Sequence, residues 1–169
     1  MVTVRAEIAA DIPAVRRVNE LAFGRPDEAA LVDALRAASV LQVSLVAVEE
    51  GRLVGHILFS PVSVESEGSA FQAMGLGPMA VLPECQGRGV GSELVREGLR
   101  ECRRGGSKVV VVLGHPGFYP RFGFVPASRK GLRSEYQVPD EVFMVAELEP
   151  EALGGRRGVV KYRPEFGAI

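Results

Sequence analysis

Glycine stands at every second position of the stretch Gln86-Gly87-Arg88-Gly89-Val90-Gly91. A β-rich apolar run precedes this stretch, and residues with the spacing of an amphipathic helix follow it. Glycine lets a backbone approach another group closely, and the free amides at the start of a helix bind anions. The pattern therefore predicts a loop that binds a phosphate group. Its structural alternative is a tight turn between a strand and a helix that binds no ligand.

Two familiar nucleotide-binding motifs do not fit this loop. A P-loop ends in Gly-Lys-Ser or Gly-Lys-Thr, but here Gly91 is followed directly by Ser92. A dinucleotide-binding fingerprint requires a glycine or alanine where Ser92 stands. It also requires an acidic residue near the end of the next strand, where this chain has Gly114 and His115. The first motif is excluded, and a Rossmann fold is disfavoured.

The elements before the loop are predicted to be antiparallel strands. Three apolar, β-rich runs cover residues 45–48, 53–64 and 71–82, and the short turns Glu50-Gly51 and Glu67-Gly68 separate them. Turns of this length join neighbouring strands into hairpins. The sequence therefore predicts an antiparallel meander that leads into the glycine loop.

The elements after the loop predict one parallel strand pair. Residues 91–104 have the apolar stripe of a helix, and residues 109–113 form an apolar run typical of a strand covered on both faces. A strand, helix, strand unit places its two strands parallel. Residues 2–8 predict a first strand, residues 12–38 two helices, and residues 142–148 a late strand. The expected fold class is mixed α/β, with a mostly antiparallel central sheet flanked by helices.

Length and composition indicate one folded domain. The chain has 169 residues, of which 47% are hydrophobic, and this is enough to bury a single sizeable core. We assign residues 1–150 to the domain and residues 151–169 to a tail packed on it. Residues 159–162 of that tail predict an edge strand, which could pair between subunits of a homodimer. The expected state is a monomer or a homodimer.

Charge and cysteine content exclude several kinds of partner. The formal net charge is −1 with no basic stripe, so nucleic acid is not an expected partner. No apolar run reaches the roughly 18 residues that cross a bilayer, so no membrane partner is expected. The two cysteines, Cys85 and Cys102, have neither metal-ligand spacing nor the density of a disulfide scaffold. We therefore expect a cytoplasmic protein without a metal.

Three segments together resemble a known family. The loop from Gln86 to Gly91 matches the Gln/Arg-x-x-Gly-x-Gly/Ala motif of the GCN5-related N-acetyltransferase, or GNAT, superfamily. Residues 75–83 (GLGPMAVLP) and 119–124 (YPRFGF) resemble the branch of predicted acetyltransferases related to the bacterial YhbS group. The order of elements is also similar over residues 2–148. The resemblance implies the acyl-CoA N-acyltransferase fold, in which the parallel strand pair splays apart around the cofactor.

The resemblance also implies which residues bind acetyl-CoA. In that family the strand before the loop hydrogen-bonds the pantetheine arm through its backbone, and Met79, Ala80 and Val81 occupy this position here. The pyrophosphate is expected on the loop and the first helical turn, which comprise Gln86, Gly87, Arg88, Gly89, Val90, Gly91 and Ser92. A kinked strand followed by unpaired amides is physically suited to such a ligand.

Tyr119 resembles the general acid of the family because it lies four residues before Gly123. A phenol with its ordinary pKa of about 10 is a competent proton donor to a leaving thiolate. The alternative is that Tyr119 only packs with Phe118, Phe122 and Phe124, since a cluster of aromatic side chains usually belongs to a core.

The sequence does not identify the general base that would deprotonate the amine. His56, His115 and Glu84 are candidates, although each residue type is more often hydrogen-bonded or on the surface. Glu20 and Glu28 lie near the helix connection that borders the acceptor site in this family. Their carboxylates could attract a cationic amine, but a solvated helix face is the simpler interpretation.

The resemblance implies an N-acetyltransferase that moves an acetyl group from acetyl-CoA to a primary amine. The expected mechanism is direct attack through a tetrahedral intermediate, with a backbone amide near Val81 stabilising the developing negative charge. Direct attack needs no enzyme nucleophile, so Cys85 is interpreted as structural. The acceptor is a small-molecule or peptide amine of unknown identity. A non-catalytic acyl-CoA-binding or sensing module is the alternative function.

Overall fold

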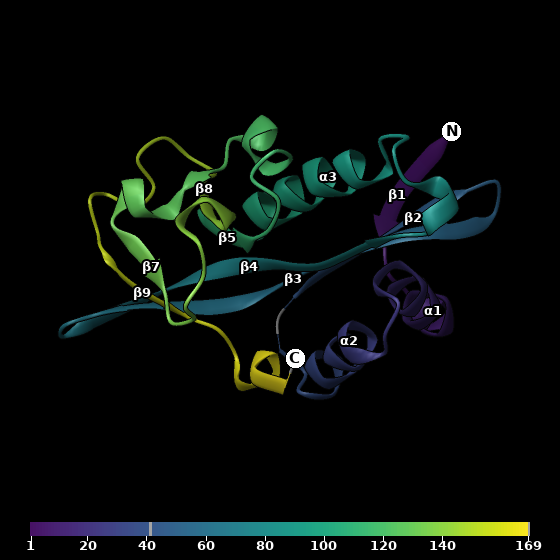
Figure 1. The fold of residues 1–169 in the computed structure, drawn as a ribbon, viewed down its shortest axis with the longest axis horizontal. Helices are drawn as coiled ribbons and strands as arrows, with labels where there is room; N and C mark the ends of the chain where they lie inside the picture. The colour runs from purple at the N-terminus through teal and green to yellow at the C-terminus, as the bar shows by residue number, and fades with distance from the viewer. Residues whose placement is uncertain (41, 169) are drawn as a thin grey trace.

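A twisted nine-stranded sheet with the path β1-β2-β3-β4-β5-β8-β6 forms the centre of the molecule (Figure 1). The structure is a computed structural model, and it describes residues 1–40 and 42–168. The strands are β1 (Val2–Ala6), β2 (Val43–Glu49), β3 (Arg52–Ser66), β4 (Ser69–Val81), β5 (Val109–Leu113), β6 (Val125–Pro126), β7 (Leu132–Ser134), β8 (Phe143–Glu147) and β9 (Gly158–Lys161). The predicted meander is confirmed, because β2, β3 and β4 pair antiparallel in sequence order.

Helices cover both faces of the sheet. The α-helices are α1 (Ile12–Phe23), α2 (Asp27–Ala37) and α3 (Val90–Arg104). The 3-10 turns are η1 (Ala9–Asp11), η2 (Pro83–Cys85), η3 (Tyr119–Phe122), η4 (Ala127–Lys130), η5 (Asp140–Val142) and η6 (Pro164–Ala168). Figure 1 shows α1 and α2 on one face, α3 on the other, and the C-terminal turn η6 beside α2. None of the described helices is long and apolar enough to cross a membrane.

Helix α3 packs very closely against the long strand β3. Leu94 and Val95 of the helix are fully buried, as its predicted apolar stripe requires. Gly98 stands directly over Phe59, and a Cβ at this position would overlap the Phe59 ring. The missing side chain thus lets α3 approach the sheet and fixes where the helix begins relative to β4.

The parallel pair predicted from the sequence is confirmed, and it is short. Strands β4 and β5 pair only from Met74 to Leu76, opposite Val110 to Val112. Strand β4 then continues to Val81 while pairing with β3 alone among the described strands. One edge of its last residues is therefore left open, and this opening is the splay that the family resemblance implied.

The tail does not form the edge strand that the sequence predicts. Strand β9 pairs antiparallel with β3 at residues 63–65 and parallel with β7 at residues 132–134. The prediction is wrong because β7, at three residues, is too short to be recognised from periodicity. With a strand on each side, β9 offers no free edge for pairing between subunits. The β7 and β9 contact also adds a second parallel pair that the sequence did not reveal.

Candidate active site

The glycine loop lines a cavity of about 680 Å³, here called the first cavity, between the open end of β4, the start of α3 and the segment from Gly114 to Arg121. Six of the predicted binding residues from the loop and helix start contribute to its wall: Gln86, Gly87, Gly89, Val90, Gly91 and Ser92. The structure thus brings the loop to the same cavity as Tyr119, which is far away in the sequence.

The loop has a left-handed backbone conformation at two of its glycines. Gly87 and Gly89 have φ angles of 77° and 87°, a region that strains other L-residues. A Cβ at either position would meet no described heavy atom within 4 Å, so the space in front of the loop is open. Gly89 directly precedes α3, and the first amides of a helix have no intrahelical partner. These donors and the helix dipole favour a phosphate here.

The end of β4 presents its backbone to the first cavity in an alternating pattern. The Leu82 amide donates to the Val54 carbonyl of β3 at 2.9 Å, so the backbone groups of Met79 and Val81 face the opposite, open edge. The Val81 carbonyl accepts a hydrogen bond from Gln86 Nε2 at 3.0 Å. The first residue of the loop motif therefore fixes the loop to the strand that precedes it.

Two of the expected binding residues do not line the first cavity. Ala80 is only 2% exposed, and alternation along β4 turns its side chain to the other face and its backbone groups toward β3. Arg88 directs its guanidinium to Glu49 of β2, with Nη2 at 2.6 Å from both carboxylate oxygens. This pairing lowers the pKa of the Glu49 carboxyl. It holds the middle of the loop against the sheet.

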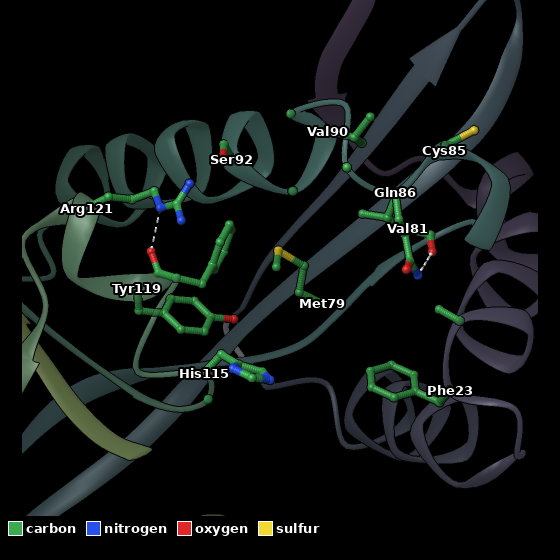
Figure 2. Close-up of a pocket in the computed structure, with 16 residues that line it drawn as sticks. Phe23, Met79, Val81, Cys85, Gln86, Val90, Ser92, His115, Tyr119 and Arg121 are labelled. Atoms are coloured by element: carbon green, nitrogen blue, oxygen red, sulfur yellow. Dashed lines mark hydrogen bonds between the residues drawn. The ribbon is translucent and has the colours of Figure 1, made fainter. Parts of the chain in front are cut away.

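Tyr119 is both a core residue and a cavity residue. Its ring is 7% exposed and packs edge-on against Phe118 and Phe124, with centroids 5.0 and 5.6 Å away. A Cβ at Gly114 would overlap this ring, so the glycine makes room for it. Figure 2 shows the Tyr119 hydroxyl pointing into the space beside Met79. Burial raises the pKa of Tyr119 to about 12, which keeps the phenol protonated at neutral pH.

The first cavity is also lined by His115, one of the three candidates for the general base, and by residues for which the sequence predicts no catalytic or binding role. Phe23 reaches the cavity from the end of α1, and His115 and Arg121 reach it from the segment after β5 (Figure 2). Phe118 of the same segment also lines it. Arg121 donates to the Phe118 carbonyl at 2.9 Å and lies over the Phe118 ring. Its guanidinium thereby orders the turn that carries Tyr119. The YPRFGF segment is the sequence signal for Arg121, whereas no motif pointed to Phe23.

A second cavity of about 470 Å³ adjoins the first. Phe23, Met79 and Tyr119 belong to the walls of both, so the two cavities meet at the Tyr119 ring. Glu28 of α2 lines the second cavity and is 6% exposed. Its carboxylate accepts a hydrogen bond from Arg25 Nε at 3.0 Å. The interpretation of Glu28 as part of a solvated helix face is therefore wrong, because its carboxylate is buried in the cavity wall and paired with Arg25, and the C-terminal turn η6 packs on the same helix.

His56 lies in the interior and lines neither cavity. Its Nδ1 is 3.3 Å from Asn19 Nδ2, and its Nε2 is 2.9 Å from Ser44 Oγ. An amide nitrogen only donates, so the Nδ1 atom accepts and the proton of the neutral ring is on Nε2. Burial and the nearby charge of Arg36 lower the pKa of His56 to about 3. His56 is thus a neutral structural group at physiological pH.

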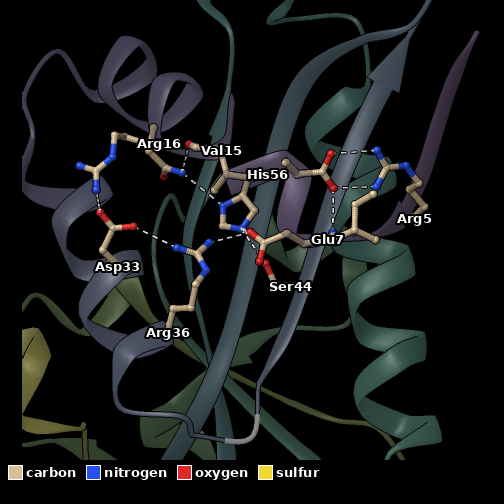
Figure 3. A network of polar contacts seen from close by, with 11 residues as sticks. Arg5, Glu7, Val15, Arg16, Asp33, Arg36, Ser44 and His56 are labelled. Atoms are coloured by element: carbon tan, nitrogen blue, oxygen red, sulfur yellow. Dashed lines mark hydrogen bonds and ion pairs between the residues drawn. The ribbon is translucent and has the colours of Figure 1, made fainter. Parts of the chain in front are cut away.

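The contacts of His56 extend into an ionic network (Figure 3). Arg36 of α2 donates to Glu7 Oε1 at 2.8 Å and to Asp33 Oδ1 at 3.0 Å. Asp33 also pairs with Arg16 of α1. Glu7 Oε1 in turn lies 3.9 Å from His56 Nε2. The network connects both N-terminal helices to β2 and β3, and so it fixes the helix connection that borders the two cavities.

The remaining residues that the sequence analysis considered for catalysis lie in different parts of the structure. Glu84 is exposed and pairs with Arg52 at 2.6 Å, and Glu20 is absent from the walls of both cavities. Cys85 is buried and lines the first cavity as a free thiol. Among the described residues, no group of three or more His, Cys, Asp or Glu side chains is placed to hold a metal ion.

Comparison with known proteins agrees with the fold and the site described above. A family model described as an acetyltransferase (GNAT) domain matches residues 3–127. The uncharacterized N-acetyltransferase YhbS of Escherichia coli K12 is 37% identical over 164 residues, which cover 96% of this chain and 97% of YhbS. The uncharacterized N-acetyltransferase YjhQ of the same strain is 42% identical over 134 residues, which cover 78% of this chain and 74% of YjhQ.

Solved structures agree over the full fold. Escherichia coli YhbS in complex with CoA superposes with a TM-score of 0.92 at 36% identity, covering 98% of this chain and 92% of that one. A GNAT family acetyltransferase from Brucella melitensis in complex with acetyl-CoA superposes with a TM-score of 0.81 at 37% identity, covering 98% of each chain. The family match over most of the chain and these near full-length relatives show that the protein belongs to the GNAT family of N-acetyltransferases.

Proposed function

We propose that the first cavity binds acetyl-CoA and that the protein transfers its acetyl group to a primary amine that enters from the second cavity. The observation that carries this proposal is the junction of the two cavities at Met79 and Tyr119, beside the open edge of β4. The CoA and acetyl-CoA complexes of the two similar structures support the choice of ligand.

The main chain supplies most of the contacts to acetyl-CoA in this proposal. The amides of Gly87 to Ser92 hold the pyrophosphate, because they lie at a helix start with open space in front of them. The outward-facing backbone groups of Met79 and Val81 hydrogen-bond the pantetheine arm. Ala80 and Arg88 act indirectly, since they pack the strand and pin the loop to Glu49.

The transfer step is a direct attack by the neutral amine. Its nitrogen forms a bond to the carbonyl carbon of the thioester through a tetrahedral intermediate, and the bond from that carbon to sulfur then breaks. The Val81 amide is oriented toward the open edge and stabilises the negative charge on the carbonyl oxygen. Tyr119 donates a proton to the departing sulfur, and water or buffer restores that proton. The amine loses its own proton to solvent.

The rival function is an acyl-CoA-binding module without turnover. A thiol-release assay with acetyl-CoA and a panel of primary amines separates the two functions. The proposal predicts amine-dependent release of CoA, accompanied by mass spectrometric detection of the acetylated amine. Calorimetric binding of CoA with no thiol release above the hydrolysis rate for any amine would favour the binding module instead.

The cysteines and the pairing of β9 bear on the location and assembly of the protein. We infer a cytoplasmic location, since Cys85 and Cys102 are both buried free thiols, as expected for a reducing compartment. We infer that it acts as a monomer or as a homodimer that does not pair through β9, because β3 and β7 occupy both edges of that strand.

A further inference from the structure

The second cavity has a wall chemistry that restricts its occupant. Glu28 is the single charged residue among the described residues that line it. The aromatic side chains of Tyr136, Tyr162 and Phe166 form one wall, with Tyr136 stacked on Tyr162 at 5.5 Å and Phe166 5.3 Å from Tyr162. Aromatic rings of this kind bind flat apolar groups. The Glu28 carboxylate is already paired with the Arg25 guanidinium. No lysine, arginine or histidine is among the described residues that line the cavity, so the wall has no cation for the carboxylate of a ligand.

The aromatic wall comes from a part of the chain beyond the family-model match. The family model ends at residue 127, whereas Tyr136, Tyr162 and Phe166 all follow it in the sequence. The C-terminal turn η6 lies beside α2 (Figure 1) and brings Phe166 and Gly167 to the cavity. This wall therefore comes from the part of the chain beyond the family-model match, and it lies on the side of Tyr119 opposite the glycine loop.

The size of the cavity limits its occupant to a small molecule. A volume of about 470 Å³ falls within the range of small-ligand pockets. An occupant must also extend to the Tyr119 ring, where the two cavities join. An amine at that end of the occupant would reach the reacting thioester, while its apolar body would contact the aromatic wall.

We propose that the acceptor is a small primary amine carried on an uncharged aromatic or apolar body, and that the C-terminal tail selects it through Tyr136, Tyr162 and Phe166. This inference rests on the proposed function of the site. It excludes amines that carry a carboxylate, because no described residue of the cavity wall offers a cation to pair with one.

A matched pair of acceptors tests the proposal directly. The compounds 2-phenylethylamine and phenylalanine share one ring and one amine, and differ by a carboxylate. With acetyl-CoA, we expect kcat/KM for 2-phenylethylamine to exceed that for phenylalanine, spermidine and a lysine-containing peptide by at least about tenfold, a typical discrimination for a buried apolar pocket. Equal or better turnover of any of these three competitors would overturn the proposal.

Two tail variants test which residues make the selection. Gly167 lines the second cavity, and a Cβ there would meet no described atom within 4 Å, so Gly167→Leu places a bulky side chain at the cavity without a clash. We expect it to raise KM for 2-phenylethylamine at least about tenfold. Phe166→Ala enlarges the cavity and should shift preference toward the larger tryptamine. Phe71→Ala, an aromatic deletion that lines neither cavity, should change none of these values.

A binding measurement separates this proposal from the proposed function. Calorimetry with CoA tests the first cavity alone, and neither tail variant should alter the affinity for CoA by more than about twofold. Titration of 2-phenylethylamine into the CoA-saturated protein then tests the second cavity without any turnover. We expect binding that Gly167→Leu weakens. If CoA binds while 2-phenylethylamine gives no heat or binds Gly167→Leu equally well, the inference about the acceptor is wrong and the first cavity stands.

Discussion

Among single residues, Tyr119 carries the most specific chemical role. Replacing it with phenylalanine removes one oxygen and leaves the edge-on packing with Phe118 and Phe124 in place. We expect kcat to fall about 10²-fold, the usual contribution of a general acid, and the affinity for CoA to stay the same. Phe122→Leu changes the same aromatic cluster outside both cavities, and its kcat should remain near that of the wild type. A Tyr119→Phe enzyme with unaltered kcat would remove the phenol from the mechanism.

The pH profile gives an independent check on the same residue. A general acid works only while protonated, and burial raises the pKa of Tyr119 to about 12. As pH rises, kcat should therefore increase with deprotonation of the bound amine and should not fall before pH 10. A solvent-exposed tyrosine has a pKa of about 10, so half of it would already be deprotonated at pH 10. A decline in kcat centred below pH 10, in protein that remains folded, would contradict a phenol in this environment.

Among the elements, helices α1 and α2 depend on the buried His56 network for their position on the sheet. The pKa of His56 is about 3 in the folded protein and 6.5 in its ordinary state. Below pH 6.5 the unfolded chain therefore binds a proton that the folded chain does not. Stability is lost as pH falls from 6.5 toward 3, and at pH 5 the loss reaches about 2 kcal/mol.

Urea denaturation at pH 7.5 and at pH 5 measures this loss. Most carboxylates keep their charge over that interval, so the change reports mainly on histidine. His56→Gln is less stable at both pH values, but its free energy of unfolding should differ between them by much less than that of the wild type. His115→Gln, which changes the exposed histidine, should retain the full dependence. Equal pH dependence in the His56→Gln protein would show that the buried ring does not titrate as described.

The elements also show what sequence reasoning can and cannot reach. The regular spacing of apolar residues was sufficient to predict the meander and helix α3, because each depends on local periodicity. The order strand, helix, strand was then sufficient to predict the parallel pairing of β4 with β5. The sequence could not show that Ala80 turns away from the first cavity, because this depends on which edge of β4 faces β3. Nor could it show that Glu28 is covered by residues from the C-terminal tail, since that contact joins distant parts of the chain.

At the scale of the whole molecule, we propose that residues 151–169 and residues 1–150 fold as one unit. Val160 of β9 is fully buried between β3 and β7, and Leu153 is 2% exposed. Val160→Ala should lower the free energy of unfolding by about 2 kcal/mol through lost burial and the cavity left behind. The half-buried neighbour Val159→Ala should cost clearly less. Equal midpoints in urea for wild type and Val160→Ala would mean that the tail is only loosely attached.

The central claim is that the main chain between β4 and α3 binds the phosphates of coenzyme A. Calorimetric titration of CoA tests it most directly, with Gly89→Glu and Gly68→Glu compared with the wild type. Both glycines have positive φ angles and open space at the Cβ position, so both variants bear similar backbone strain, but only Gly89 lies at the first cavity. The account predicts that the wild type and Gly68→Glu bind CoA and that Gly89→Glu does not. Unchanged binding by Gly89→Glu, or no binding by the wild type at millimolar CoA, would contradict it.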